Sequence, residues 1–257
     1  MTSVLQVRIQ ECLKKREILL MSHAVLGYPS VDENIETINA FANAGVEMIE
    51  LQFPFSEPIA DGPTLMHANQ VALQNGITVS QCFKEAKKIT TAHKNVIFVI
   101  MTYYNLIFHM GDRAFVKQAA DSGILGIIVP DLPPEEAGDF LEACEEFGVS
   151  PIFLFTPKTT TARMAYIAER ARGMIYCVAR AGVSGYSTLF SHEFDLYIKR
   201  AREASSLPIG VGFGVQSRED VESLKGKADI AIVCSQAVRI AVEKGPKDAA
   251  AFLQQLR

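Results

Sequence analysis

Two carboxylic residues, Glu50 and Asp61, have neighbours that suit proton-transfer chemistry. Glu50 lies in an apolar run that spans residues 46–51. Side chains alternate between the two faces of a strand, so Glu50 shares a face with Met48, while Ile49 and Leu51 share the other. If the Ile49 face packs against helices, Glu50 points into the interior, where a carboxyl group suits general acid or base catalysis. A structural ion pair with a loop Arg or Lys accounts for Glu50 equally well.

The segment after Glu50 combines stiffness with a second acid. Residues 52–63 contain three prolines, and Asp61 stands close to the end of the segment, before Gly62 and Pro63. Proline restricts the backbone, so the segment favours a loop of fixed shape that presents a carboxylate. Asp-Gly-Pro is also an ordinary turn or helix-start signal.

The elements that must position these residues repeat along the chain. Short apolar runs recur at intervals of about 30 residues, the length of one βα unit. The segments between them have helical character at residues 31–44, 113–122, 134–147 and 218–224, and three of these end at a glycine, as helix C-caps do: Gly45, Gly123 and Gly148. The eight runs begin near Ile18, Val46, Val96, Ile124, Val149, Met174, Pro208 and Ala228.

Eight alternating units predict an α/β fold, a (β/α)8 TIM barrel, formed as a single domain by residues 1–257. Residues 4–15 are expected to form an extra N-terminal helix that closes the barrel bottom. An open doubly wound sheet is the competing architecture, and the strand count and the absence of G-x-G-x-x-G after the first strand disfavour it. Active sites of such barrels lie at the carboxyl ends of the strands, where Glu50 is expected.

The composition excludes several classes of function. The chain has 25 basic and 29 acidic residues and a formal net charge of −4, which disfavours nucleic-acid binding. Its apolar runs are too short to cross a membrane. Five scattered cysteines suit reduced thiols in the cytoplasm. We expect no cofactor, and we expect no metal because the histidines form no ligand pattern in sequence. His23 is interpreted as a hydrogen-bonded core residue with no carboxylate placed beside it by spacing.

The segment around Glu50 and Asp61 closely resembles the signature of the tryptophan synthase α subunit family. The motif consists of Glu50-Leu51, Pro54-Phe55-Ser56 and Ala60-Asp61-Gly62-Pro63. The similarity continues along almost the whole chain, at Gly27-Tyr28-Pro29, Tyr103-Tyr104-Asn105, Asp131-Leu132-Pro133, the segment 180–185 and Gly212-Phe213-Gly214.

The resemblance implies a lyase that cleaves indole-3-glycerol phosphate to indole and glyceraldehyde 3-phosphate by a retro-aldol reaction. It implies a β-subunit partner in an α2β2 complex and a role in tryptophan biosynthesis. The catalytic positions it gives are Glu50, Asp61 and Tyr176. The substrate-binding positions it gives are His23, Tyr103, Asp131, Ser184, Gly185, Phe213, Gly214, Cys234 and Ser235.

Four residues differ from the family pattern. His23 stands where the family has an aromatic residue, Gln52 and Cys234 stand where it has glycine, and Glu57 replaces an aspartate. The Cβ and thiol of Cys234 are expected to crowd the phosphate or to conflict with a glycine-only backbone angle. By strand parity, Gln52 points toward the same mouth as Glu50.

Three other functions stay open. The first is another phosphate-binding barrel enzyme, which would be expected to offer a lysine at a strand end. The second is an α-type subunit with weak or no activity that mainly activates a β-type partner, and the third is a stand-alone indole-releasing lyase. Turnover of indole-3-glycerol phosphate with and without the partner separates these alternatives.

Overall fold

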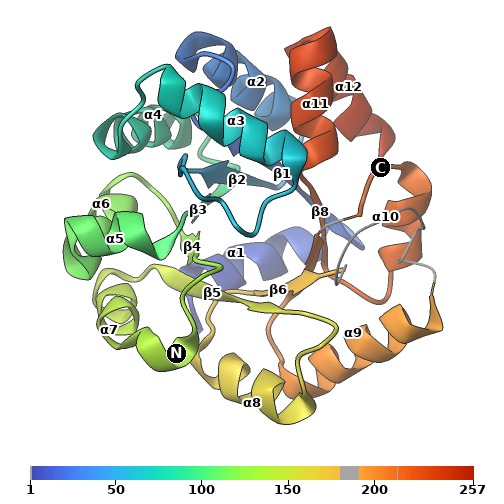
Figure 1. The fold of residues 1–257 in the computed structure, drawn as a ribbon. Helices are drawn as coiled ribbons and strands as arrows, with labels where there is room; N and C mark the ends of the chain where they lie inside the picture. Colours follow the sequence, from blue (N-terminus) through green and yellow to red (C-terminus); the bar gives the residue numbers. More distant parts are fainter. Residues whose placement is uncertain (1, 180–190, 213) are drawn as a thin grey trace.

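The chain folds into a closed barrel of eight parallel strands surrounded by helices (Figure 1). The computed structural model describes residues 2–179, 191–212 and 214–257. Neighbouring strands pair in sequence order, and β1 closes the barrel against β8. The strands are β1 Leu19–Val25, β2 Met48–Gln52, β3 Ile97–Met101, β4 Gly126–Ile128, β5 Ser150–Phe155, β6 Ile175–Val178, β7 Ile209–Gly212 and β8 Ile230–Val233.

This topology confirms the predicted (β/α)8 barrel. Each strand begins one or two residues after the start of an apolar run. The runs identify the strands because helices cover the outer face and the barrel interior covers the inner face, so both faces need apolar side chains.

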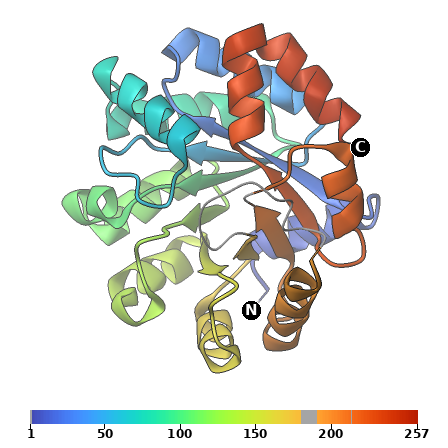
Figure 2. The same cartoon turned by 45° about the vertical axis from the view of Figure 1, so that its right-hand side comes forward.

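Helices form the outer ring, which Figure 2 shows from a second direction. Glycines with positive φ end α2, α6 and α7 as predicted: φ is 84° at Gly45, 77° at Gly123 and 70° at Gly148. The helices are α1 Val4–Leu13, α2 Val31–Asn43, α3 Pro63–Gln74, α4 Val79–Ala92, α5 Tyr104–Met110, α6 Asp112–Asp121, α7 Gly138–Phe147, α8 Thr161–Arg170, α9 His192–Ala204, α10 Arg218–Leu224, α11 Ser235–Lys244 and α12 Pro246–Gln255.

The helix predicted over residues 134–147 is divided. A 3-10 turn, Pro134–Glu136, precedes α7, and Ala137 between them has φ −94° and ψ 18°. This conformation departs from α-helical values, so the regular helix starts only at Gly138. No helix in the described parts of the chain is long and apolar enough to span a membrane.

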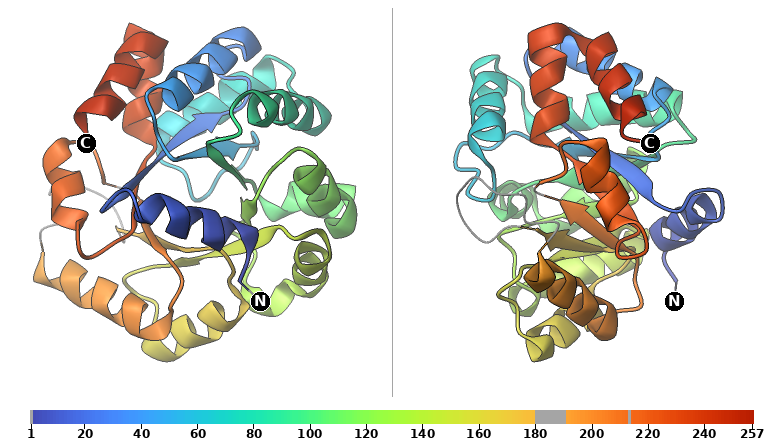
Figure 3. Two further views of the ribbon diagram at one scale, coloured as in Figure 1. Left: turned by 180° about the vertical axis from the view of Figure 1, so that it is seen from behind. Right: turned by 90° about the vertical axis from the view of Figure 1, so that its right-hand side faces the viewer.

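The expected N-terminal helix is present as α1 and lies across one end of the barrel (Figure 3). Its inward residues, Leu5 and Ile9, are fully buried and pack with the side chains that fill the barrel interior. A Cβ added at Gly126 or Gly173 would collide with Leu5, so glycine at these positions lets α1 approach the strands closely. In Figure 3 the β2–α3 loop lies at the opposite end of the barrel, which leaves that end for the site.

Candidate active site

A cavity of about 190 Å³ opens at the carboxyl ends of the strands. It is lined by seven of the predicted catalytic and substrate-binding residues, contributed by β1, β2, β6, the β2–α3 loop and the segments after β7 and β8. These residues are His23, Glu50, Asp61, Tyr176, Gly214, Cys234 and Ser235.

Glu50 occupies the inner face of β2, as strand parity predicts. Met48 on the same face belongs to the interior cluster, whereas Ile49 and Leu51 belong to the layer between strands and helices. Glu50 is only 3% exposed. Its Oε2 atom is buried and has no hydrogen-bond partner among the described residues. One carboxylate oxygen therefore stays available to a molecule in the cavity.

His23 lies beside Glu50 because the two residues are partners in the β1–β2 register. The His23 Nδ1 atom is 3.0 Å from Glu50 Oε1. The imidazole is also fully enclosed, with 1% exposure. The sequence interpretation of His23 as a hydrogen-bonded core histidine holds, but the expectation that no carboxylate accompanies it is wrong.

Gln52 connects His23 to the second acid. Its Nε2 atom donates to Asp61 Oδ2 at 2.6 Å, which turns its carbonyl oxygen toward His23 Nε2 at 2.9 Å. An amide oxygen only accepts hydrogen bonds, so His23 carries a hydrogen on Nε2. The contact between Nδ1 and Glu50 then requires one further proton, which His23 and Glu50 share. The structure thus holds a proton next to the candidate acid.

Local charges and burial shift two of these groups. Burial disfavours the charged imidazole, but the Glu50 carboxylate and Cys234 outweigh it and hold the pKa of His23 well above its usual value. Burial raises the pKa of Asp61, and the hydrogen bond from Gln52 partly opposes that rise.

Tyr176 and Cys234 also line the cavity, with the Cys234 sulfur within 4.8 Å of ligand atoms of His23 and Glu50, and Gly212 adjoins Tyr176. The Tyr176 hydroxyl lies 3.9 Å from the Cys234 sulfur, and burial raises the pKa of both groups. A Cβ at Gly212 would overlap the Tyr176 hydroxyl, so glycine at that strand end gives the ring its space. Cys234 has φ −98°, outside the left-handed region that favours glycine, so the expected conflict with a glycine-only angle is absent.

The loop that carries Asp61 is held at several points. The Ala60 amide donates to the Tyr103 hydroxyl at 3.0 Å, and Asn69 on α3 donates to Asp61 Oδ2 at 3.3 Å. The same Asn69 accepts from the Phe55 amide at 2.9 Å. Tyr103 does not line the cavity. It supports the loop instead, with its ring stacked on that of Phe55.

Four other predicted site residues lie elsewhere or outside the description. Asp131 does not line the cavity; its carboxylate accepts from the Tyr104 amide at 2.9 Å, at the start of α5. Ser184, Gly185 and Phe213 lie outside the described residues.

One part of the cavity suits an anion. Gly214 and Gln216 line it, together with Ser235 and Gln236 in the first turn of α11. Backbone N–H groups at a helix start have no partner within the helix, and the helix dipole adds positive potential there. This arrangement matches the position at which barrels of this kind bind phosphate groups.

The arrangement favours proton transfer over nucleophilic catalysis. Both ring nitrogens of His23 already have partners, Glu50 and Gln52, and burial raises the pKa of the Cys234 thiol. His23, the base beside the thiol, is therefore already engaged by other partners. Glu50, with one oxygen 3.0 Å from His23 Nδ1 and the other without a partner among the described residues, fits a general acid and base.

Comparison with known proteins gives one consistent family. Residues 9–256 match the family model described as tryptophan synthase alpha chain. The tryptophan synthase alpha chain of Syntrophotalea carbinolica is 48% identical over 254 residues, covering 99% of this chain and all of the relative. That of Desulforapulum autotrophicum is 46% identical over 253 residues, covering 98% of this chain and all of the relative.

Solved structures agree. A solved structure of Mycobacterium tuberculosis tryptophan synthase matches this chain with a TM-score of 0.91 at 32% identity, and the match covers all of this chain and 98% of that one. The tryptophan synthase complex of Pyrococcus furiosus matches with a TM-score of 0.82 at 32% identity, covering 93% of this chain and 95% of that one. The chain belongs to the tryptophan synthase alpha chain family.

Proposed function

We propose that Glu50 is the general acid and base with which this chain cleaves indole-3-glycerol phosphate to indole and glyceraldehyde 3-phosphate in tryptophan biosynthesis. The family assignment supports the lyase activity. One observation carries the assignment of Glu50: a buried carboxyl group in the barrel mouth lies 3.0 Å from His23 Nδ1 through Oε1, while Oε2 has no partner among the described residues.

The reaction needs a proton to be added at one atom and removed at another. Glu50 donates the proton that it shares with His23 to the indole ring carbon that bears the glycerol chain. The resulting carboxylate then accepts the proton of the C3′ hydroxyl as the carbon–carbon bond breaks, so the side chain returns to its starting state. His23 is a positioning residue in this scheme, because it holds the Glu50 carboxyl group and shares its proton.

Asp61 binds the indole N–H and stabilises the positive charge that develops on the ring after protonation. Hydrogen bonds from Gln52 and Asn69 hold its Oδ2 atom in place. The phosphate binds at Gly214 and at the start of α11. Tyr176, next to Cys234, forms the wall beside Glu50.

A tryptophan synthase β subunit is the proposed partner, in an α2β2 complex. Support comes from the complexes to which this chain is structurally similar and from two exposed apolar residues that follow the carboxyl ends of neighbouring strands. Ile59 in the β2–α3 loop is 80% exposed, and Phe108 on α5, after β3, is 70% exposed. Burial of such side chains in an interface is favourable. The predicted cytoplasmic location is part of this proposal.

The test is turnover of indole-3-glycerol phosphate by the purified chain, alone and with a cognate β subunit. We expect slow cleavage alone and a large increase with the partner. Replacement of Ile59 by Asp should reduce that increase and should not change the activity of the chain without the partner. Replacement of the exposed Leu196 on α9 by Asp is the matched control. Absence of cleavage under both conditions would instead support an activator without catalysis, and full activity alone would support an independent lyase.

A further inference from the structure

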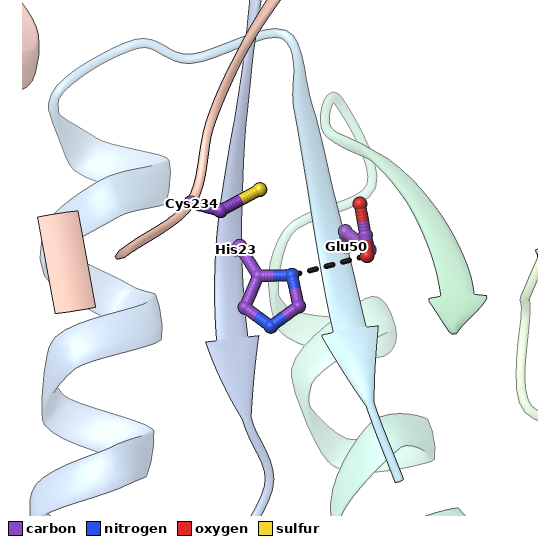
Figure 4. Close-up of side chains that lie close together, drawn as sticks. All are labelled: His23, Glu50 and Cys234. Atoms are coloured by element: carbon purple, nitrogen blue, oxygen red, sulfur yellow. Dashed lines mark hydrogen bonds and ion pairs between the residues drawn. The ribbon is translucent and has the colours of Figure 1, made fainter. Parts of the chain in front are cut away.

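Three side chains with metal-binding atoms meet in the mouth of the barrel. His23 comes from β1, Glu50 from β2 and Cys234 from the position directly after β8 (Figure 4). One ligand atom from each, a ring nitrogen, a carboxylate oxygen and the sulfur, lie within 4.8 Å of one another. Figure 4 shows the Cys234 sulfur on the same side as the paired His23 and Glu50.

The surrounding contacts orient the His23 imidazole for metal binding. A histidine that binds a metal through one nitrogen usually donates the other N–H to an oxygen, which fixes its tautomer and its orientation. Here Gln52 Oε1 accepts from His23 Nε2 at 2.9 Å, and Asp61 fixes the Gln52 amide. The His23 Nδ1 atom therefore faces the other two side chains of the cluster, and only the shared proton lies between Nδ1 and Glu50.

The Glu50 carboxyl group gives an independent indication of a cation site. Its Oε2 atom is buried without a hydrogen-bond partner among the described residues, although the side chain is only 3% exposed. A buried carboxylate oxygen left without a donor is costly, and a cation satisfies it.

We propose that His23, Glu50 and Cys234 form a binding site for a thiophilic divalent ion of the Zn²⁺ class. Tetrahedral zinc with nitrogen, oxygen and sulfur ligands places those atoms about 3.4 to 3.6 Å apart. The observed ligand atoms lie within 4.8 Å of one another, and His23 Nδ1 is 3.0 Å from Glu50 Oε1, so the observed distances bracket these separations. Thiolate and imidazole ligands disfavour Mg²⁺ and Ca²⁺, which prefer oxygen.

The ion displaces the proton that His23 and Glu50 share, and binding also releases the proton of the Cys234 thiol. A carboxylate and a thiolate neutralise its charge of two. Three protein ligands leave a fourth position open toward the cavity, as in zinc sites that retain solvent. If Glu50 is the acid and base proposed above, its coordination by zinc blocks cleavage; this consequence, unlike the binding itself, rests on the proposed function.

Two of the three ligands occur at positions where the sequence departs from the family pattern, His23 for an aromatic residue and Cys234 for a glycine. Neither an aromatic hydrocarbon ring nor a glycine offers a ligand. The site is therefore a property of chains with this combination of residues, and not of the barrel.

Titration of the metal-free protein with Co²⁺ tests the binding directly, because cobalt bound to a thiolate has a characteristic charge-transfer absorption and tetrahedral cobalt has strong visible bands. We expect one equivalent to bind, Zn²⁺ to displace it, and affinity to fall at least about tenfold in each of Cys234→Ser, Cys234→Gly and His23→Phe, since each removes one ligand. Cys12→Ser is the matched control, because Cys12 is a partly exposed free thiol on α1 at the other end of the barrel. Circular dichroism verifies the fold of each variant.

Equal affinity in the wild type and in the folded Cys234→Ser variant, or loss of the thiolate band in Cys12→Ser, would overturn the proposal. A separate assay of indole release measures whether Zn²⁺ inhibits in competition with the substrate. Cobalt binding without any lyase activity would contradict the proposed function and support the metal site, whereas cleavage without cobalt binding would do the opposite.

Discussion

The two ends of the barrel are built by the same strands with different side chains. At the end covered by α1, the inward residues of β1, β2 and β8 are apolar: Leu19, Met21, Met48, Ile230 and Ile232. Two residues further along each strand, the inward positions become His23, Glu50 and Cys234. A single step of the strand repeat thus separates an apolar core from a cluster of titratable groups.

The difference indicates that the end of the barrel covered by α1 mainly stabilises the fold and that the open end mainly carries the chemistry. Apolar side chains at the closed end are stabilised by burial from water, which supports the fold. The polar groups at the open end are buried at a cost, which is offset only by their contacts with one another. Replacements at the open end should therefore mainly change activity, and replacements at the closed end should mainly change stability.

The largest effect is expected for Glu50→Gln. The amide fills the same space and cannot transfer a proton, so kcat/KM for cleavage of indole-3-glycerol phosphate with the β subunit should fall at least about 10³-fold. The circular dichroism spectrum should stay that of the wild type. Activity within about tenfold of the wild type would show that Glu50 is not the general acid and base.

Asp61→Asn should have the next largest effect. It removes the negative charge that faces the indole N–H, and loss of such electrostatic stabilisation lowers kcat by about 10² to 10³-fold. Steady-state kinetics with the partner present measures this effect. An unchanged kcat with a raised KM would show that Asp61 only binds the ground state.

At the closed end, Leu5→Ala should lower the free energy of unfolding by about 2 to 5 kcal/mol, because it leaves a cavity between α1 and the strands. Urea denaturation measures the change. The matched control is Val7→Ala on the same helix, where the side chain is 41% exposed and the expected change is below about 0.5 kcal/mol. A loss of kcat in folded Leu5→Ala that matches that of Asp61→Asn would contradict the division between the two ends.

The smallest effect is expected for Ser150→Ala, at the start of β5 near α1. The Ser150 hydroxyl is buried without a hydrogen-bond partner among the described residues. Its removal should therefore change the free energy of unfolding by less than about 1 kcal/mol, in the stabilising direction. A clear loss of stability in the same urea assay would show that this end also depends on a polar contact.

Most of the fold could be predicted from the sequence, because buried parallel strands need continuous apolar runs and helix ends need particular residues. Gly45, Gly123 and Gly148 mark helix ends by their positive φ. The interruption before α7 was not predictable from the apolar pattern, since it depends on the backbone angles of Ala137 alone.

The site was only partly predictable. Strand parity places Glu50 and Gln52 on the inner face of β2 because it is a local property of the chain. The contact between His23 and Glu50 depends on the register of two strands, and its partners are 27 residues apart in sequence. Cys234 joins them only when β8 closes the barrel against β1. A search for metal ligands at short spacing therefore could not find this cluster.

The most direct test of the account is a crystal structure of the Glu50→Gln variant with indole-3-glycerol phosphate bound. The account predicts that residue 50 lies against the ring carbon that bears the glycerol chain and that Asp61 accepts from the indole N–H. The phosphate should lie at Gly214 and the start of α11. A ring carbon in contact with a different titratable side chain, with residue 50 turned away from the substrate, would contradict it.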